Sequence, residues 1–255
     1  MKKMLGAILL TAALVSPASP VAAITYGEPT GSAYGNVGSM VAEVRGDYYQ
    51  VCSGTLIKHG VLLTASHCLV GIPEDWNLYV SFAEDLESPA PLIPVTGVVV
   101  HPDYGKNMAN PYDVGALLFA TGASSDLTPA AVAPVGYLTE MSQRELRAAT
   151  FTAVGYGTIR TSRKQGPQGI LDNTQRRYGE QSALSLQEAW LTLNMNEATG
   201  GKGTCYGDSG GPHFHDGYIV SLTVTGDAMC KATDKTYRLD RRWVHDFLDD
   251  NDLLP

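Results

Sequence analysis

Three side chains that lie far apart in the sequence could together perform acyl transfer. Ser209 lies in the hexapeptide Gly207–Pro212, His67 in the segment Thr64–Cys68, and Asp113 just before a hydrophobic run. A serine hydroxyl is a poor nucleophile at neutral pH, so it needs a base within hydrogen-bond reach and a carboxylate that orients the base. We therefore interpret Ser209 as the nucleophile, His67 as the base and Asp113 as the orienting carboxylate.

The start of the chain is typical of a secretory signal. Lys2 and Lys3 precede the largely apolar run Leu5–Val15, and small residues follow it up to Ala23. This pattern indicates export and cleavage, because the apolar run is too short to span a membrane. We expect a signal peptide over residues 1–23, a mature chain over residues 24–255, and a secreted, extracellular or periplasmic protein.

The charge balance narrows the class of partner. The chain has 18 basic and 26 acidic residues and a formal net charge of −8, and loss of Lys2 and Lys3 makes it more negative still. An acidic surface disfavours nucleic acid and anionic membranes. We therefore expect neither as a partner, and we expect a monomer.

Short apolar runs separated by Gly, Pro, Asn and Asp predict an all-β protein. The predicted strands span residues 39–44, 52–57, 61–65, 78–82, 92–100, 116–119, 151–156, 189–193 and 218–225. The sequence predicts only two helices, over residues 139–147 and 240–248, the second with an apolar face at helical spacing. The polar segment 158–182 is predicted to be a surface loop.

The four cysteines favour disulfides, because an even number in an exported chain is typical of a covalent framework. Three connectivities are possible. We favour Cys52 with Cys68 and Cys205 with Cys230, since each bridge would then close a short loop around a candidate catalytic residue.

The sequence gives little indication of a metal. His213 and His215 alternate along a predicted strand but lack a third ligand, and alternating polarity is ordinary for a strand. The acidic residues at 84, 85 and 87 are more typical of a solvated turn than of a calcium site. We expect no metal and no cofactor.

These motifs and their order resemble the trypsin and chymotrypsin family of secreted serine proteases, over essentially the whole mature chain. The family motif Gly-Asp-Ser-Gly-Gly-Pro is present unaltered, the histidine motif differs only at Ser66, and His101–Tyr104 matches the segment that precedes the family's aspartate. The order histidine, aspartate, serine is also that of this family. The resemblance implies two packed six-stranded antiparallel Greek-key barrels followed by a C-terminal α-helix, in one protease domain over residues 24–255.

The resemblance also implies roles for the backbone and the amino terminus. The backbone amides of Gly207 and Ser209 would form the oxyanion hole, where negative charge develops on the substrate. In the family, a newly freed amino terminus pairs with the aspartate beside the nucleophile. Here this pair would be Ile24, created by signal cleavage, and Asp208.

The specificity pocket implied by the resemblance departs from that of trypsins. Gly203 lies six residues before Ser209, where trypsins have an acidic residue, so the floor formed by Gly203 and Thr204 should be uncharged. Ser221 and Thr223 match the segment that lines the pocket. Thr223 replaces a glycine and should narrow the entrance.

The back wall of this pocket is harder to predict. Aligning Tyr237 with the family tyrosine puts Lys235 at a glycine position and Asp234 beside it. An inward Asp234 would favour basic substrates, whereas an inward Lys235 would favour acidic ones. We favour small or medium apolar side chains before the cut, in polypeptide substrates, with protein inhibitors as further partners.

Two other interpretations compete with a protease. A secreted binding protein on a protease scaffold would no longer catalyse, and Thr223 with Lys235 could close its pocket. A lipase-type Gly-x-Ser-x-Gly elbow would need its acid and histidine after Ser209, and only 46 residues follow. The presence of all three catalytic candidates favours a serine endopeptidase.

Overall fold

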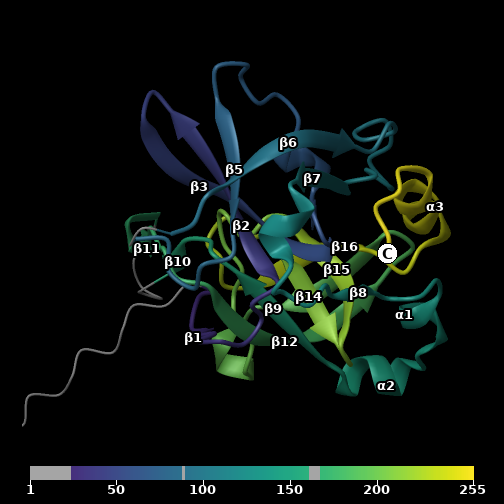
Figure 1. The fold of residues 1–255 in the computed structure, drawn as a ribbon. Helices are drawn as coiled ribbons and strands as arrows, with labels where there is room; N and C mark the ends of the chain where they lie inside the picture. Colours follow the sequence, from purple (N-terminus) through teal and green to yellow (C-terminus); the bar gives the residue numbers. More distant parts are fainter. Residues whose placement is uncertain (1–23, 88–89, 161–166) are drawn as a thin grey trace, which may run out of the picture.

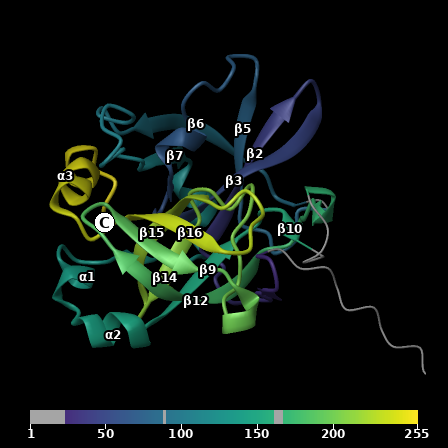
Figure 2. The same ribbon diagram turned by 180° about the vertical axis from the view of Figure 1, so that it is seen from behind.

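Two closed six-stranded antiparallel barrels, packed side by side, make up most of the molecule (Figures 1 and 2), as expected. This computed structural model describes residues 24–87, 90–160 and 167–255; the expected signal peptide lies outside them. Among these residues, no helix is long and apolar enough to cross a membrane. The two disulfides join Cys52 to Cys68 and Cys205 to Cys230, the pairing that the sequence favoured.

The two barrels have the same strand order. In both, the first three strands are adjacent, the last three run back in reverse, and the fourth strand pairs with the first. The first barrel contains β2 (Val37–Val44), β3 (Asp47–Lys58), β4 (Val61–Thr64), β7 (Gly115–Phe119), β6 (Ile93–Val100) and β5 (Asn77–Ser81), in that spatial order. The second contains β9 (Thr150–Gly155), β12 (Arg177–Leu186), β13 (Trp190–Asn194), β16 (Thr233–Arg238), β15 (Tyr218–Gly226) and β14 (Pro212–His215).

Short elements complete the fold. β1 (Glu28–Pro29) pairs with β12, β8 (Ala131–Val132) runs parallel to β15, and β10 (Ile159–Arg160) pairs with β11 (Ile170–Leu171). In the part of the chain that the structure describes, 3₁₀ turns cover residues Ser66–Cys68, Thr121–Ser124, Pro167–Gly169 and Glu197–Thr199.

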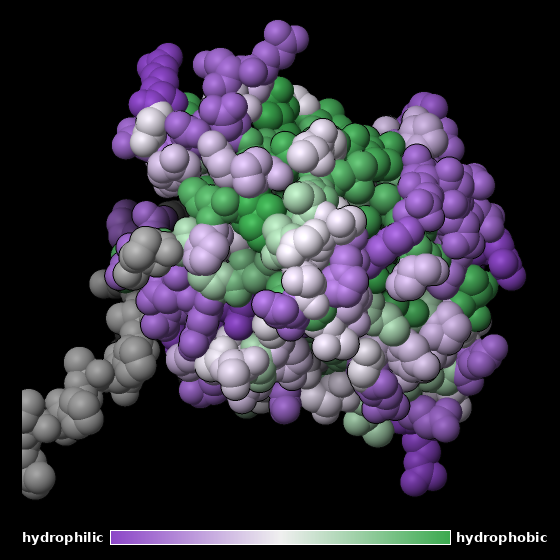
Figure 3. All heavy atoms as spheres, viewed as in Figure 1, coloured by the Kyte–Doolittle hydropathy of each residue, from purple (hydrophilic) through white to green (hydrophobic). Residues whose placement is uncertain are grey.

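Apolar side chains fill each barrel and also the contact between them. Leu56, Leu62 and Leu117 are buried in the first barrel, and a separate cluster fills the second. A third cluster joins residues of both barrels to the C-terminal helix α3 (Arg242–Asp250). On the face shown in Figure 3, hydrophobic residues also reach the surface over the first barrel. The shared core holds the two barrels in a fixed relation.

The helix predicted over residues 139–147 is wrong as a single element. The structure has α1 (Tyr137–Glu140) and α2 (Gln143–Ala148), because Met141 adopts an extended backbone between them. Ser142 then caps α2, with its side chain accepting from the Glu145 amide and the Glu145 carboxylate accepting from the Ser142 amide. This capping box starts a new helix rather than continuing the old one.

The loop predicted over residues 158–182 is also wrong in its last part. Strand β12 begins at Arg177, where the sequence is polar, and Arg177 and Gln181 are both buried. Arg176, just before the strand, donates to the carbonyl oxygens of Val37 and Phe82. Polar residues can occupy these buried positions because they find acceptors inside the fold: Arg177 donates to the Gly27 carbonyl at 3.3 Å, and Gln181 donates to the Lys202 carbonyl at 2.8 Å.

A buried ion pair attaches the end of β16 to α1. Both nitrogens of the Arg238 fork donate to Asp240, at 2.8 and 2.7 Å, and the Leu138 amide donates to the same carboxylate at 2.9 Å. The two side chains are 3% and 0% exposed. Asp240 is therefore held by its bonds outside α3, which begins two residues later than predicted.

We predict that Asp240→Ala lowers the free energy of unfolding by about 3–5 kcal/mol, because it leaves the Arg238 guanidinium buried without its partner. Urea unfolding measures this change. The matched control is Glu188→Ala, which removes an exposed contact to Arg241 at 3.8 Å and should change stability by no more than about 0.5 kcal/mol. Equal effects of the two substitutions would contradict the prediction.

Candidate active site

The three candidate catalytic residues come from both barrels. His67 lies in the 3₁₀ turn after β4, Asp113 lies just before β7, and Ser209 lies just before β14. The first two belong to the first barrel and the third to the second, so the site forms only where the barrels meet.

Asp113 holds His67 at two points. Its Oδ1 accepts from the His67 backbone amide at 2.8 Å, and its Oδ2 lies 2.8 Å from Nδ1 of the ring. The Asp113 side chain is 4% exposed and that of His67 is 29% exposed. This arrangement fixes the ring and makes Nδ1 the donor, which leaves Nε2 to exchange a proton.

Ser66, the one residue that differs from the family histidine motif, strengthens this arrangement. Its hydroxyl donates to the Val114 carbonyl at 2.6 Å and accepts from the His101 amide at 3.3 Å. Ser66 therefore connects the histidine turn directly to the aspartate segment. From the sequence alone, Ser66 is only a small difference from the family motif.

The loop that carries Ser209 packs closely against the first barrel. The Ser53 amide donates to the Ser209 carbonyl at 2.8 Å. Gly210 has a φ of +76°, and a Cβ there would collide with Thr64 Oγ1. In the described part of the chain, His67 and Ser209 side chains share no hydrogen bond, although Cys68 Sγ lies 3.8 Å from the Ser209 carbonyl oxygen.

Two backbone donors beside Ser209 are free. Within the described residues, neither the Gly207 nor the Ser209 amide donates a hydrogen bond. The Gly207 carbonyl is held on its other side, by Gln50 Nε2 and by Ser53 Oγ, each at 2.9 Å. The loop is thus fixed by two residues that the sequence did not single out, and its amides remain available.

Asp208 is a fully buried carboxylate with two backbone donors. The amides of Gly157 and Cys205 each donate to it at 2.8 Å. Burial raises the pKa of Asp208 to about 7; the two hydrogen bonds oppose the rise, and the nearby Asp234 adds to it. An unpaired carboxylate in such a place is costly in its charged form.

The segment beginning at Ile24 lies beside this loop. Ile24 is fully buried, and Thr25 pairs with Gly203 through two backbone hydrogen bonds of 2.6 and 2.9 Å. Thr25 Oγ1 also accepts from the Arg160 amide at 3.1 Å. No hydrogen bond joins Ile24 to Asp208 in the part of the chain that the structure describes.

A cavity of about 310 Å³ opens beside Ser209, and we call it the acyl-side cavity. Its lining includes Thr204 and Thr223, two of the six predicted pocket residues, together with Cys205, Tyr206, Val224, Thr225, Gly226, Asp227, Ala228 and Cys230. A larger cavity of about 870 Å³ includes none of the three candidate catalytic residues in its lining. We therefore associate the chemistry with the smaller one.

The other four predicted pocket residues do not line this cavity. Gly203 pairs with Thr25, and the Ser221 hydroxyl accepts from Thr236 at 2.9 Å in the interior. Lys235 places its ammonium 4.1 Å from the centre of the Trp190 ring. Neither a basic nor an acidic group from the predicted back wall therefore reaches the cavity.

Asp234 points into the second barrel instead. Its Oδ2 lies 3.0 Å from His213 Nε2 and accepts from Gln181 Nε2 at 3.3 Å, with all three residues buried. His215 lies apart from this cluster, with its Nδ1 2.8 Å from the Tyr137 hydroxyl. The two histidines considered as metal ligands thus have different partners.

Potential metal ligands gather at one place among residues 24–87, 90–160 and 167–255. This group is Cys52, His67 and Cys68, and its two sulfur atoms are joined in a disulfide. A disulfide sulfur carries no thiolate to bind a metal. The group therefore gives no reason to expect a metal centre.

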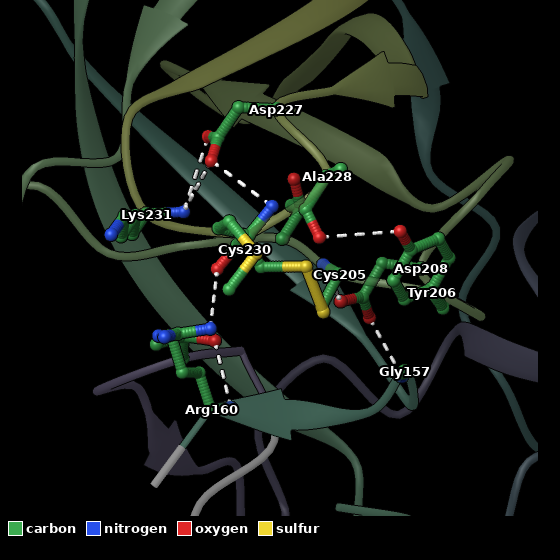
Figure 4. Close-up of a disulfide and its surroundings, with 12 residues drawn as sticks. Gly157, Arg160, Cys205, Tyr206, Asp208, Asp227, Ala228, Cys230 and Lys231 are labelled. Carbon is green, nitrogen blue, oxygen red and sulfur yellow. Dashed lines mark hydrogen bonds between the residues drawn. A yellow bond between two sulfur atoms is a disulfide. The ribbon is translucent and has the colours of Figure 1, made fainter. Parts of the chain in front are cut away.

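One wall of the acyl-side cavity is a loop built around Asp227 (Figure 4). Its carboxylate accepts from the amides of four residues that follow it, at 2.7–3.4 Å, namely Met229, Lys231, Ala232 and Thr233. Partial burial acts to raise the pKa of Asp227, but these donors outweigh it and hold the pKa below its usual value. The negative charge of Asp227 is therefore compensated by amides of its own loop.

Three further contacts hold the same loop in place. The Tyr206 hydroxyl donates to the Ala228 carbonyl at 3.2 Å, and Arg160 donates to the Met229 carbonyl at 3.2 Å. The disulfide from Cys205 to Cys230 joins the loop to the segment before Ser209 (Figure 4). These contacts give the cavity a defined wall.

We predict that Asp227→Ala loosens this wall, because four amides lose a charged acceptor. Hydrogen exchange of the amides of residues 229 and 231–233 should accelerate by at least about tenfold, since a charged hydrogen bond contributes about 1.5–3 kcal/mol. Asp227→Asn, which keeps one acceptor oxygen, should give a smaller change. Unchanged exchange in both variants would show that the carboxylate does not hold the loop.

Comparisons with known proteins agree with this architecture. The trypsin family model matches residues 30–238. Kallikrein 1-related peptidase b27 of Mus musculus is 29% identical over 202 residues, covering 74% of this chain and 75% of its own. A trypsin of Saccharopolyspora erythraea is 28% identical over 193 residues, covering 75% and 82%.

A solved structure, HL collagenase, has the same fold, with a TM-score of 0.67 and 16% identity over 92% of this chain and all of its own. The family resemblance found in the sequence is thereby confirmed. This chain belongs to the trypsin family and is a serine-type endopeptidase that acts on polypeptide substrates.

Proposed function

We propose that this protein is a secreted monomeric endopeptidase that cleaves peptide bonds through an acyl-enzyme on Ser209. The observation that carries the proposal is the two-point contact of Asp113 with His67 at the barrel junction, directly beside the Ser209 loop. A histidine oriented by a buried carboxylate and placed near a serine is the arrangement that activates the hydroxyl.

In the proposed reaction, Ser209 Oγ attacks the substrate carbonyl while His67 Nε2 takes the hydroxyl proton. Asp113 keeps the ring in the required tautomer and stabilises its charged form without becoming protonated. The same nitrogen then gives the proton to the leaving amine, and water repeats the sequence to release the acid. The hydrogen bond between His67 and Ser209 would form when substrate is bound, since such bonds often tighten only in the complex.

The free amides of Gly207 and Ser209 would stabilise the oxyanion that forms on the substrate carbonyl. Gly207 has a φ of +94°, which favours glycine at this point of the loop. Its carbonyl is already bonded to Gln50 and Ser53, so the loop needs little rearrangement during the reaction.

For the residue before the cut, we propose a small or medium apolar side chain. The acyl-side cavity measures about 310 Å³, and the one carboxylate among its described lining residues, that of Asp227, accepts from backbone amides. Thr223, Tyr206 and Ala228 all line it, and the Tyr206 hydroxyl donates to the Ala228 carbonyl at 3.2 Å. A long charged side chain would find no free partner of opposite charge there.

We predict that Ser209→Ala lowers kcat by at least about 10⁴-fold and leaves the fold intact, because the nucleophile is removed while a small residue replaces it. Hydrolysis of a peptide library varied before the cut measures the loss, and circular dichroism checks the fold. Labelling by a serine-reactive phosphonate should occur in the wild type and disappear in the variant. A wild-type protein that neither cleaves nor reacts would instead fit a non-catalytic scaffold.

We also propose that export creates the active form, by cleavage after Ala23. The new ammonium of Ile24 would pair with Asp208. Two observations support this: among the described residues, the buried Asp208 carboxylate is bonded to two backbone amides only, and Thr25 anchors the segment to Gly203, near the Ser209 loop. A buried opposite charge would hold Asp208 ionised and order the loop.

The proposal predicts opposite pH dependences for two forms of the chain. With residues before Ile24, the raised pKa of Asp208 favours its neutral form in the folded state, so stability should fall as pH rises from about 4 to about 7. The loss could reach about 4 kcal/mol, at 1.36 kcal/mol per pKa unit. In a chain that starts at Ile24 the carboxylate is paired with the ammonium. Stability should then begin to fall only above about pH 8, where the amino group of the unfolded chain loses its proton.

Urea unfolding of both forms between about pH 4 and pH 9 tests this prediction, with Asp208→Asn as the control. The Asp208→Asn variant of the longer form should lose the fall between about pH 4 and pH 7. Amino-terminal sequencing of exported protein should give Ile24 first. Identical pH profiles for the two forms, or exported protein with another first residue, would refute the activation proposal.

A further inference from the structure

The backbone just before Asp113 has an unusual conformation. Tyr112 has a φ of +53°, in the left-handed region that residues other than glycine rarely adopt. A residue with a Cβ keeps such a backbone only where the surrounding structure holds it there. The turn includes Asp113 itself, because the Val114 amide donates to the Tyr112 carbonyl across it at 2.9 Å. The contacts that hold Tyr112 therefore also set the position of Asp113.

A chain of hydrogen bonds from the second barrel reaches this turn. Trp243 of α3 donates from Nε1 to the Tyr237 hydroxyl at 2.9 Å, and that hydroxyl lies 2.8 Å from Asn110 Oδ1. An indole N–H can only donate, so the Tyr237 oxygen accepts from Trp243 and gives its own proton to Asn110. The same Oδ1 accepts from the Tyr112 amide at 3.3 Å. The chain therefore runs from α3 through β16 to the residue before Asp113.

Tyr237 is placed to act as a rigid donor in this chain. It is fully buried near the end of β16 and lies opposite Trp190 of β13 in the sheet. Burial raises the pKa of Tyr237 above its usual value, although the hydrogen bond from Trp243 opposes the rise, so the hydroxyl keeps its proton. Trp190 itself donates from Nε1 to the Ala109 carbonyl at 3.1 Å. Two neighbouring aromatic residues of the second barrel thus hold two consecutive residues, Ala109 and Asn110, of the segment that leads to Asp113.

A ring contact supports the same turn. The centre of the His101 ring lies 4.7 Å from that of Tyr112, in a stacked arrangement, and 4.7 Å from that of Phe247 in α3. Figures 1 and 2 show α3 beside the loop between β6 and β7. Helix α3 is therefore connected to the turn twice, through the His101 ring and through the hydrogen-bonded chain that starts at Trp243.

The alignment of Asp113 with His67 depends on this backbone. The carboxylate bonds His67 at two points, so a displacement of Asp113 would weaken both contacts. A misplacement of about 1 Å can cost about 10²-fold in rate. We propose that Tyr237 is a positioning residue: its hydroxyl acts through Asn110 to keep the Asp113 carboxylate aligned with His67. The second barrel then controls the geometry of a pair that belongs to the first. This inference rests on the proposed acyl-enzyme function.

Tyr237→Phe tests the proposal, because it removes the hydroxyl and keeps the ring. With an alanine peptide anilide as substrate, kcat should fall by about fivefold or more while KM stays within about twofold of the wild type, since no substrate contact is removed. Active-site titration with a serine-reactive phosphonate counts the competent molecules, so a loss of folded protein does not enter kcat. The proton NMR signal of His67 Nδ1–H should broaden, because a looser partner lets this proton exchange faster with water.

Asn110→Ala removes the acceptor of the same hydroxyl from a half-buried position. It should lower kcat to a similar extent. The double variant should be within about twofold of the slower single variant, because both substitutions break one chain. The matched control is Tyr137→Phe, which removes another tyrosine hydroxyl of the same chain, one that lies 2.8 Å from His215 Nδ1. This control should change neither kcat nor the NMR signal.

An unchanged kcat in Tyr237→Phe, equal effects of Tyr237→Phe and Tyr137→Phe, or effects that multiply in the double variant would each overturn the inference and leave the protease function in place. A higher KM with unchanged kcat would also overturn it, since the hydroxyl would then act in substrate binding. A wild type that neither cleaves the anilide nor reacts with the phosphonate would overturn the proposed function itself. The two failures are therefore distinguishable in the same experiment.

Discussion

The close backbone contact at Ser53 is the constraint on which the site depends. Its amide donates to the Ser209 carbonyl, its hydroxyl donates to the Gly207 carbonyl and accepts from the Tyr156 amide, and its carbonyl accepts from Thr64. One fully buried serine on β3 thus bonds the histidine-bearing barrel to the serine-bearing loop. A Cβ at Gly210 would collide with Thr64 Oγ1 and with the Ser53 carbonyl, so a side chain there would push the Ser209 loop away from the first barrel.

Asp208 is buried close to this contact with Ser53. Its carboxylate occupies the space beside Gly155 and Gly157, where added Cβ atoms would collide with it. Two amides alone do not offset the cost of burying a charge, and the raised pKa of Asp208 reflects that imbalance. The loop is therefore positioned by packing, and no cationic group of the described residues pairs with Asp208; in our proposal, a free amino terminus at Ile24 supplies that charge.

The sequence predicted the parts of the structure that depend on local pattern. Alternating apolar runs located most strands of both barrels, and the motifs located His67, Asp113 and Ser209 at their junction. The loop predicted for Arg177 and Gln181 was wrong, because buried partners allow these polar residues to form strand β12. It also failed for Asp234, because pairing of β16 with β13 opposite Leu193 turns this side chain into the barrel, toward His213. Register of that kind depends on distant strands, and a shift of one residue would reverse every side chain.

The cavity beside Ser209 contains a carboxylate that does not set its preference for charge. On the acyl side, Asp227 lies in the cavity wall, but its own loop uses its carboxylate, so its charge holds the wall and has no free oxygen to attract a substrate. A carboxylate bonded to four amides mainly fixes shape, because these donors already compensate its charge. Selection before the cut should therefore follow size rather than charge.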